Sequence, residues 1–328
     1  MIQVTFIETI LNMKFSFTLE NENKQFNLSK DHYQRLREMY RLEEDTTEQD
    51  NNIQFHQHLL LLLFRYHDIY SYELSIPNMV IKSLQDHYGL QHECFSSPMD
   101  VSKYINSFCS RFPDTDIPFG SNGSFFNCFV EEGCYECNPP PIEEFLIRNI
   151  THILTCLEKA DEAEKPLTFF VVTPNWDEPT CQSYNLALYG TPTRPENENE
   201  MGKYYVMHLL FDRDNHFYRN GTAYRTGKQT EKAGQHSMMI VLQNNKARET
   251  VPIGTKSDLE GVVNVSWSLE SEEYKTAIRM PVYNQGGKKR NSPNQNRNSG
   301  TNSVSYSRKR NSRGREGDEQ FERRRRRY

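Results

Sequence analysis

The sequence has little of what would indicate a secreted or membrane-spanning protein. Of its 328 residues only two are Trp and seven are Cys, and a cysteine count that is small and odd does not suit a disulfide framework. The apolar run Leu59–Phe64 is far shorter than the roughly 20 residues that cross a bilayer. Glu8 and Lys14 interrupt the fairly apolar opening stretch, Met1–Leu19, so we expect strands there and no secretory leader. We therefore expect an intracellular protein with free thiols and no membrane span.

Charge is distributed unevenly along the chain. The net charge is −5, but residues 286–328 contain 14 Lys and Arg and 4 Asp and Glu, so this tail carries +10 and residues 1–285 carry −15. The tail has two basic clusters, Arg308–Arg310 and Arg323–Arg327, and is otherwise rich in Asn, Ser and Gly. Such a composition cannot bury enough apolar area to fold, so we predict a disordered tail. Nucleic-acid binding, nuclear import and simple solubilisation all remain open for it.

Four segments in the first third of the chain carry helix signals. Apolar residues recur at helical spacing in 29–41 and 54–70, on either side of an acidic linker. Pro at the start and Gly just past the end predict a helix over Pro77–Tyr88. We expect a fourth helix over Pro98–Ser110. The N-terminal region, 1–90, is thus predicted to be small and mostly helical.

Helices and strands then alternate. Apolar residues at helical spacing, with Glu143 and Glu144 at the start, predict a helix over Ile142–Ala160. Buried strands are expected at 167–172, 204–211 and 237–243. This alternation predicts an α/β sheet with helices on its faces. We place this α/β domain at 91–283 and the disordered basic tail at 284–328.

The segment 112–141 is rich in Gly, Pro, Asn and aromatic residues, and we expect the functional site there. It ends in Asn138-Pro139-Pro140-Pro141, directly before a predicted helix. One interpretation is a proline-rich turn that caps the helix. The other is the Asp/Asn-Pro-Pro-aromatic turn of amino-group methyltransferases, in which a side-chain oxygen accepts a hydrogen bond from the target amine. Two prolines would hold a backbone carbonyl toward the same amine, so that catalysis comes from positioning.

Several further segments occur in the order and at about the spacing of one family. Between about Leu59 and Asn245 the chain resembles the cap-specific mRNA adenosine N6-methyltransferase family, also called phosphorylated CTD-interacting factor. The resemblance is carried by Glu93-Cys94-Phe95-Ser96-Ser97-Pro98, Phe112-Pro113-Asp114-Thr115-Asp116, Phe119-Gly120-Ser121, Gly133-Cys134-Tyr135-Glu136-Cys137-Asn138-Pro139-Pro140, Phe169-Phe170-Val171-Val172-Thr173-Pro174-Asn175-Trp176, His216-Phe217-Tyr218-Arg219-Asn220-Gly221 and Met239-Ile240-Val241-Leu242-Gln243-Asn244.

The resemblance implies a helical region packed on a Rossmann-like methyltransferase domain that uses S-adenosylmethionine. The implied reaction is methyl transfer to N6 of the adenosine next to the 7-methylguanosine cap, with capped RNA as the partner. The implied catalytic turn is Asn138, Pro139, Pro140 and Pro141. We assign the cofactor site to Phe119, Gly120, Ser121, Asp116 and Glu136, and RNA or cap binding to Arg219, Lys203, Arg225 and Trp176.

The chain departs from the family pattern at Pro141, where the family has an aromatic residue that stacks on the base. It also lacks the family's WW domain, so we expect no binding to the phosphorylated RNA polymerase II tail. An active RNA methyltransferase and a pseudoenzyme that binds RNA or a protein partner both remain open. An amino-group methyltransferase for DNA or protein glutamine is a third alternative. Nuclear location is expected, with a cytoplasmic one open.

Cys134 and Cys137 have a metal-ligand spacing, but no second pair of this kind is present. We therefore expect no metal site.

Overall fold

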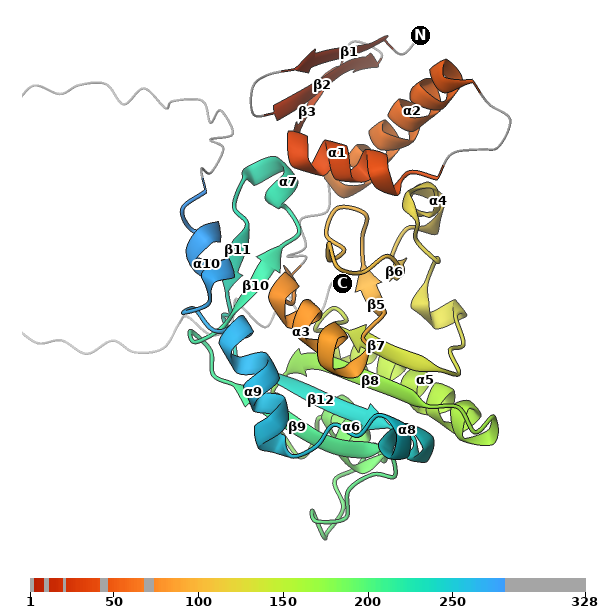
Figure 1. Ribbon diagram of the computed structural model, residues 1–328, viewed down its shortest axis with the longest axis vertical. Coiled ribbons are helices and arrows are strands. Elements are labelled where there is room, and N and C mark those ends of the chain that lie inside the picture. The colour runs from red at the N-terminus through yellow and green to blue at the C-terminus, as the bar shows by residue number, and fades with distance from the viewer. Residues whose placement is uncertain (1–2, 9–11, 20–21, 42–46, 68–73, 281–328) are drawn as a thin grey trace, which may run out of the picture. The chain divides into compact units, whose positions relative to one another are not determined.

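A six-stranded mixed sheet forms the centre of the computed structural model, which describes residues 3–8, 12–19, 22–41, 47–67 and 74–280 (Figure 1). Its strand order is β6-β5-β7-β8-β12-β9. β5, β6, β7 and β8 are parallel, and β12 is antiparallel to both of its neighbours. The bounds are β5 His92–Ser96, β6 Phe108–Ser110, β7 Gly133–Cys137, β8 Leu167–Pro174, β9 Tyr205–Phe211 and β12 Ser237–Gln243. The predicted α/β class is confirmed, and this sheet is consistent with a Rossmann-like methyltransferase fold.

Helices cover both faces of the sheet. Alternate residues of β8, Phe169 and Val171, share one core with α5 (Glu143–Glu162) and α6 (Gln182–Tyr189). The intervening Phe170 and Val172 share the other core with α3 (Asn78–Tyr88) and α9 (Lys256–Trp267). Both faces of β8 are therefore buried, which is why it is a continuous apolar run in the sequence.

The N-terminal region begins with an antiparallel three-stranded sheet, β1 (Gln3–Glu8), β2 (Asn12–Leu19) and β3 (Glu22–Ser29). Two helices follow, α1 (Lys30–Met39) and α2 (Glu48–His67). Strands over the opening stretch and helices near 29–41 and 54–70 agree with the predictions. The expectation of a mostly helical region was incomplete, because the strands extend to Ser29, whose side chain then caps α1.

A second small sheet has the order β11-β10-β4, with β4 Leu74–Ser75, β10 Phe217–Asn220 and β11 Thr230–Lys232. The remaining helices are short: α4 Pro113–Asp116, the 3-10 turns η1 Ile117–Phe119 and η2 Phe125–Asn127, α7 Ala223–Thr226, α8 Asn245–Thr250 and α10 Glu272–Ala277. Within the described ranges, no helix has both the length and the apolar character needed to span a membrane.

The helix predicted over Pro98–Ser110 is wrong. This segment is irregular and ends in β6. Its polar groups are held by distant residues instead of helix neighbours, since the Asp100 carboxylate accepts from Ser75 and the backbone N–H of Ser102 donates to Glu93 over 2.7 Å. Tertiary bonds have overridden a local pattern.

Contacts divide the chain into two units, Met1–Gln285 and Gly286–Tyr328. The proposed division near residue 90 stays a prediction. The tail predicted over 284–328 lies outside the described residues.

Candidate functional site at the carboxyl ends of the parallel strands

The parallel strands place their carboxyl ends along one edge of the central sheet. The chain passes from β5 to β6 on one side and returns to β7 on the other side of β5. This reversal between β5 and β7 is the topological switch point at which open α/β sheets bind ligands. The candidate site therefore lies beyond Ser96 and Cys137, the last residues of these two strands.

Asn138 directly follows β7 and is half-buried. Its Nδ2 donates a hydrogen bond of 2.7 Å to the carbonyl oxygen of Leu74 in β4. Within the described part of the chain, Asn138 Oδ1 accepts no hydrogen bond. The oxygen that an amine would need is therefore available, and the donor end of the same amide fixes how the side chain is turned.

The turn after Asn138 does not cap the following helix through its side chain. α5 begins at Glu143 with Ile142 as the N-cap residue, and the cap has no side-chain hydrogen bond. Pro139 is buried, whereas Pro140 and Pro141 are exposed. Asn138 is thus free of the capping role that would have explained the turn by structure alone.

Unpaired polar atoms gather at this edge. Ser97 Oγ follows β5, Glu136 Oε1 belongs to β7 and Asn175 Oδ1 follows β8, and all three are buried without a hydrogen-bond partner among the described residues. A buried polar atom without a partner costs about 1–3 kcal/mol. Three such atoms from three neighbouring strand ends indicate a place where a polar ligand supplies the missing partners.

Beneath this edge lies a buried cluster of carboxyl groups. Glu93 and Glu136 are directly opposite one another on β5 and β7, and Asp100 lies nearby. Burial raises the pKa of Glu136 well above its usual range, and the neighbouring charge of Glu93 raises it further. Burial also raises the pKa values of Glu93 and Asp100, although Arg219 opposes the shift at both. Glu136 therefore holds a proton more tightly than an ordinary glutamate.

Arg219 belongs to this cluster, so its predicted role at cap phosphates does not fit the structure. The residue is 8% exposed. Its Nε donates to the Ile76 carbonyl over 2.8 Å, and its Nη1 donates to the Asp100 carbonyl over 2.5 Å and to the Asp100 carboxylate over 3.4 Å. A guanidinium with its donors directed inward neutralises the buried carboxyl groups rather than a solvent-side phosphate.

Two further residues assigned to RNA are held by other parts of the chain. Lys203 forms an ion pair of 2.6 Å with Asp161, next to Tyr205 at the amino end of β9. Because β9 runs parallel to β8, this is the opposite edge of the sheet from Asn138. Arg225 donates to the His67 carbonyl over 2.8 Å at the end of α2. Lys203 is therefore remote from the turn, and Arg225 is bound to the end of α2.

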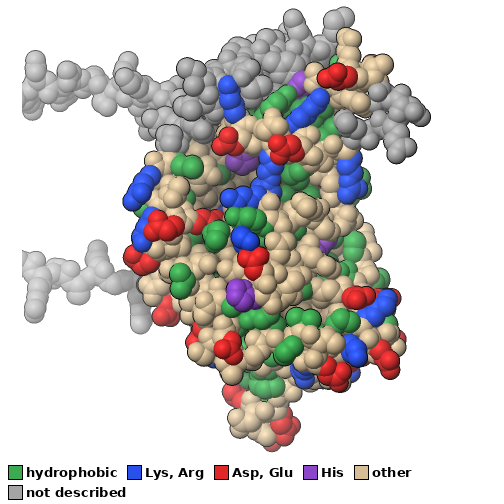
Figure 2. Space-filling view, viewed as in Figure 1, with side chains coloured by type: hydrophobic (Ala, Val, Ile, Leu, Met, Phe, Trp, Pro, Cys, Tyr) green, Lys and Arg blue, Asp and Glu red, His purple; other side chains and the backbone are tan. Residues whose placement is uncertain are grey.

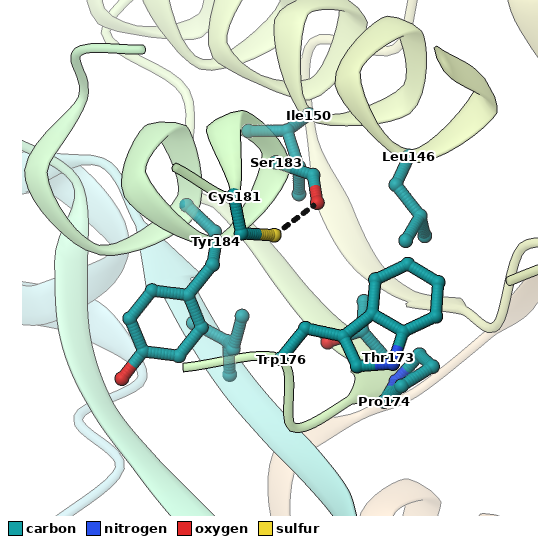
Figure 3. Close-up of a pocket in the computed structure, with 10 residues that line it drawn as sticks. Leu146, Ile150, Thr173, Pro174, Trp176, Cys181, Ser183 and Tyr184 are labelled. Atoms are coloured by element: carbon teal, nitrogen blue, oxygen red, sulfur yellow. Dashed lines mark hydrogen bonds between the residues drawn. The ribbon is translucent and has the colours of Figure 1, made fainter. Parts of the chain in front are cut away.

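Trp176 does lie at the carboxyl edge, two residues past the end of β8. It is half-buried and lines a small apolar pocket with Leu146, Ile150 and Tyr184 (Figure 3). Figure 3 shows its indole turned toward Leu146 of α5, the helix that follows the Asn138 turn. Trp176 thus shares this edge of the sheet with Asn138.

The residues assigned to the cofactor have different surroundings. Glu136 lies at the edge, as described, and Ser121 Oγ is 2.6 Å from Ser110 Oγ at the end of β6. Gly120 has φ +95°, a conformation that favours glycine. The Asp116 carboxylate is already engaged by the Tyr66 hydroxyl at 2.7 Å and the Thr115 hydroxyl at 3.0 Å.

Phe119, which is assigned to the cofactor, lies in the core. It is fully buried, with its ring 5.5 Å from that of Tyr40 and 6.3 Å from that of Phe55. Together with the Tyr66–Asp116 hydrogen bond, it ties the loop after β6 to α1 and α2. Cys134 and Cys137 point to opposite faces of β7, since one belongs to each core.

The comparisons with known proteins agree with this geometry. The family model described as "Phosphorylated CTD interacting factor 1 WW domain" matches residues 35–221, more than half of the chain. The chain belongs to this family. The matched range runs from α1 to β10, and the expectation that a WW domain is missing stays a prediction.

Two curated relatives carry the same name, "mRNA (2'-O-methyladenosine-N(6)-)-methyltransferase". The human protein is 32% identical over 173 residues, which cover 52% of this chain and 22% of that protein. The mouse protein is 32% identical over 172 residues, with the same two shares. The matched segment thus spans about a fifth of each curated relative.

Sequence reasoning assigned no role to Ser97 or Asn175. Each follows a strand end within a segment that carries the resemblance, and that position was the available signal. Glu93 and Asp100 were missed because acidic residues in a half-polar segment did not indicate burial.

Proposed function

We propose that this protein transfers a methyl group from S-adenosylmethionine to N6 of an adenosine next to the cap of mRNA. The observation that carries the proposal is Asn138 Oδ1, an acceptor without a partner among the described residues, at the carboxyl end of β7. Membership of the family and the activity named for the human and mouse relatives support the choice of RNA adenosine.

The residues present fit the cofactor. S-adenosylmethionine carries an ammonium group and sugar hydroxyls, which can donate hydrogen bonds. Ser97 Oγ and Glu136 Oε1 are buried oxygens without a hydrogen-bond partner among the described residues, so they could accept them. We assign these two residues to hold it, at the switch point between β5 and β7. When bound, the cofactor supplies an electrophilic methyl group.

Asn138 then orients the target amine. Its Oδ1 accepts one N–H of the amine, and the backbone after it presents a carbonyl held by two prolines. Because Nδ2 is already bound to Leu74, the side chain need not reorganise when substrate arrives. Fixing the nitrogen lone pair toward the methyl group supplies the rate increase through positioning. The N–CH3 bond would form as the S–CH3 bond breaks, S-adenosylhomocysteine would leave, and the methylated nitrogen would lose one proton to solvent.

Trp176 supports binding of the base. The exposed Pro141 offers little surface for stacking, whereas the indole of Trp176 lies at the same edge of the sheet. Stacking on an aromatic ring is worth about 1–3 kcal/mol per base. Pro141 is also the observation that favours the second candidate function, a pseudoenzyme that binds RNA without transferring a methyl group.

An assay with labelled methyl donor tests the proposal. The full chain is incubated with capped RNAs that differ only in starting with A or G. We expect label in the A-initiated RNA alone, since guanosine has no N6 amine. Cofactor binding by calorimetry without transfer to either RNA would favour the pseudoenzyme. Failure to bind cofactor at millimolar concentration would overturn the proposed enzyme and the cofactor site at the switch point.

We further propose that the protein acts in the nucleus and that its basic tail contacts nucleic acid or the import machinery. The +10 charge of residues 286–328 supports this proposal. On the face drawn in Figure 2, acidic and basic side chains of the described residues are interspersed.

A further inference from the structure

A groove runs along α5 on its solvent side. It is lined by two aromatic rings from the loop after β6 and by four helix residues: Phe126, Phe129, Arg148, Thr151, His152 and Thr155. We call it the α5 groove. The space is open and measures about 310 Å³. Phe129 is 55% exposed, which is unusual for a phenylalanine.

A cation lies over each aromatic ring of the groove. The Arg148 guanidinium is 4.0 Å from the centre of the Phe126 ring, and Lys159 Nζ is 3.5 Å from that of Phe129. Neither Arg148 nor Lys159 forms an ion pair with any described residue. The nearby Glu131 is instead paired with Lys165 at 3.0 Å. The groove therefore presents flat apolar rings and two cations that form no ion pair with a carboxylate of the described residues.

The remaining polar groups of the groove are mostly engaged within the protein. The Thr151 and Thr155 hydroxyls donate to helix carbonyls over 2.8 and 3.0 Å. His152 Nε2 lies 2.8 Å from the Cys128 carbonyl, and burial lowers its pKa. Few groups are left to read the edge of a base. A ligand held here would be recognised by ring faces and negative charge.

One end of the groove lies near the carboxyl edge of the sheet. The Phe126 ring is 5.7 Å from Phe95, the residue before the last in β5, and 5.1 Å from Phe145, in the first turn of α5. From Arg148 to Lys159 the helix extends about 16 Å at 1.5 Å per residue. The groove thus begins beside the proposed active site and leads away from it.

We propose that the α5 groove holds an unpaired segment of the RNA whose first nucleotides occupy the active site. When RNA binds, Arg148 and Lys159 move from the ring faces to phosphates, and bases stack on Phe126 and Phe129 in their place. Stacking platforms with interleaved cations bind single strands with little sequence preference. The identity of the ligand as RNA rests on the proposed function, but the binding surface itself is tested without methyl transfer.

The test compares a fluorescein-labelled, uncapped single-stranded RNA with the same strand carrying abasic sites. The abasic strand keeps its phosphates, so binding by the tail is retained and only stacking is lost. Binding to the full chain is followed by anisotropy. We expect the intact protein to prefer the normal strand, and Phe129→Ala to weaken its binding about 5- to 150-fold, equivalent to about 1–3 kcal/mol.

Matched variants control for exposure and charge. Leu210→Ala removes an apolar side chain of equal exposure, 54%, from β9, and should leave binding unchanged. Arg148→Ala and Lys159→Ala should each lower the salt dependence of binding, whereas Lys82→Ala, on α3, should not. Phe129→Tyr keeps a ring face and should bind like the original protein, which guards against a folding defect.

Equal affinity of Phe129→Ala and the original protein for the normal strand would overturn the proposal. So would a preference of the groove for an acidic peptide over RNA, measured by competition. Loss of binding in Phe129→Ala by a protein that transfers no methyl group would support the groove and refute the proposed function. Methyl transfer to A-initiated RNA, together with unchanged RNA binding in Phe129→Ala, would support the proposed function and refute the groove.

Discussion

The side-chain amide of Asn138 is tied by its nitrogen to the backbone of Leu74, 64 residues earlier in the chain, over 2.7 Å. Leu74 belongs to β4, whose next residue, Ser75, donates to Asp100 and pairs with Arg219. The orientation of the amide at the carboxyl edge therefore depends on a short strand and on the buried carboxyl cluster. A substitution that breaks only the bond to Leu74 therefore tests the orientation of the amide separately from the presence of its oxygen.

Asn138→Asp keeps an acceptor oxygen but replaces the donor to Leu74 with a carboxylate that faces a carbonyl. We expect methyl transfer to fall about tenfold to a thousandfold, because an acceptor without its anchor is poorly placed. Asn138→Ala should lose transfer altogether, and both variants should bind cofactor normally by calorimetry. Activity of Asn138→Asp at the original level would show that the Leu74 bond is dispensable.

Pro141→Phe returns an aromatic ring to the position where the family has one. If base stacking limits the reaction, transfer to capped A-initiated RNA should rise about tenfold to a few hundredfold. If Trp176 already covers the base, the new ring crowds it and the rate falls. Trp176→Leu in the original protein separates the two cases, since it lowers the rate only in the second.

Arg219→Leu leaves the carboxyl groups of Glu93 and Asp100 buried without their counter-charge. Removing one partner of a buried ion pair costs about 3–5 kcal/mol, so the melting temperature should fall markedly. Arg65→Leu, which breaks an exposed pair with Asp114, should change stability by less than about 1 kcal/mol. A normal melting temperature for Arg219→Leu, accompanied by weaker RNA binding, would restore the original assignment of Arg219 to RNA.

Glu136 should make stability depend on pH. Its pKa is raised on folding, so the folded chain binds this proton more tightly than the unfolded chain does. The folded state therefore loses stability as the pH rises above about 4.3, the ordinary pKa of glutamate. Glu136→Gln should raise the melting temperature at pH 8 relative to the original protein and have little effect near pH 4. The exposed Glu132→Gln is the control, and an equal effect at both pH values would contradict the prediction.

Removing residues 286–328 should leave the melting temperature unchanged, since their composition provides no apolar core to lose. RNA binding should weaken, and its dependence on salt should flatten, because up to 14 cations are lost. An affinity with the same salt slope would limit the tail to targeting or solubility.

The sequence predicted those elements whose own residues determine them. α3 has a proline before it and Gly89 with φ +71° after it, and α5 has a regular apolar face, so both were found. β8 was found because both of its faces are buried. β5 and β7 were missed because Glu93 and Glu136 interrupt their apolar pattern, and only their partners across the sheet explain why these charges are tolerated.

The sequence predicted those parts of the candidate site that are made by residues adjacent in the chain. It did not predict the parts made by residues that only the fold brings together. Asn138 could be recognised from the prolines that follow it. The surroundings of Lys203 and Arg225 could not be predicted. Strand direction puts Lys203 at the opposite edge of the sheet, and Arg225 is bound to the end of α2. Ser97 and Asn175 become visible only once three strand ends are side by side.

The position of β12 has a consequence for the order in which the protein can be completed. β9 forms the end of the sheet, and its neighbour in the strand order is β12, which is made 26 residues later. During synthesis, β9 has no strand to pair with until Ser237–Gln243 has left the ribosome, so its apolar residues Leu209 and Phe211 stay unpaired over that interval. An unpaired apolar strand is prone to aggregate. A fragment that ends at residue 221, where the family match ends, would lack β12. β9 would then have no strand partner, and β8 would become an exposed edge of the sheet.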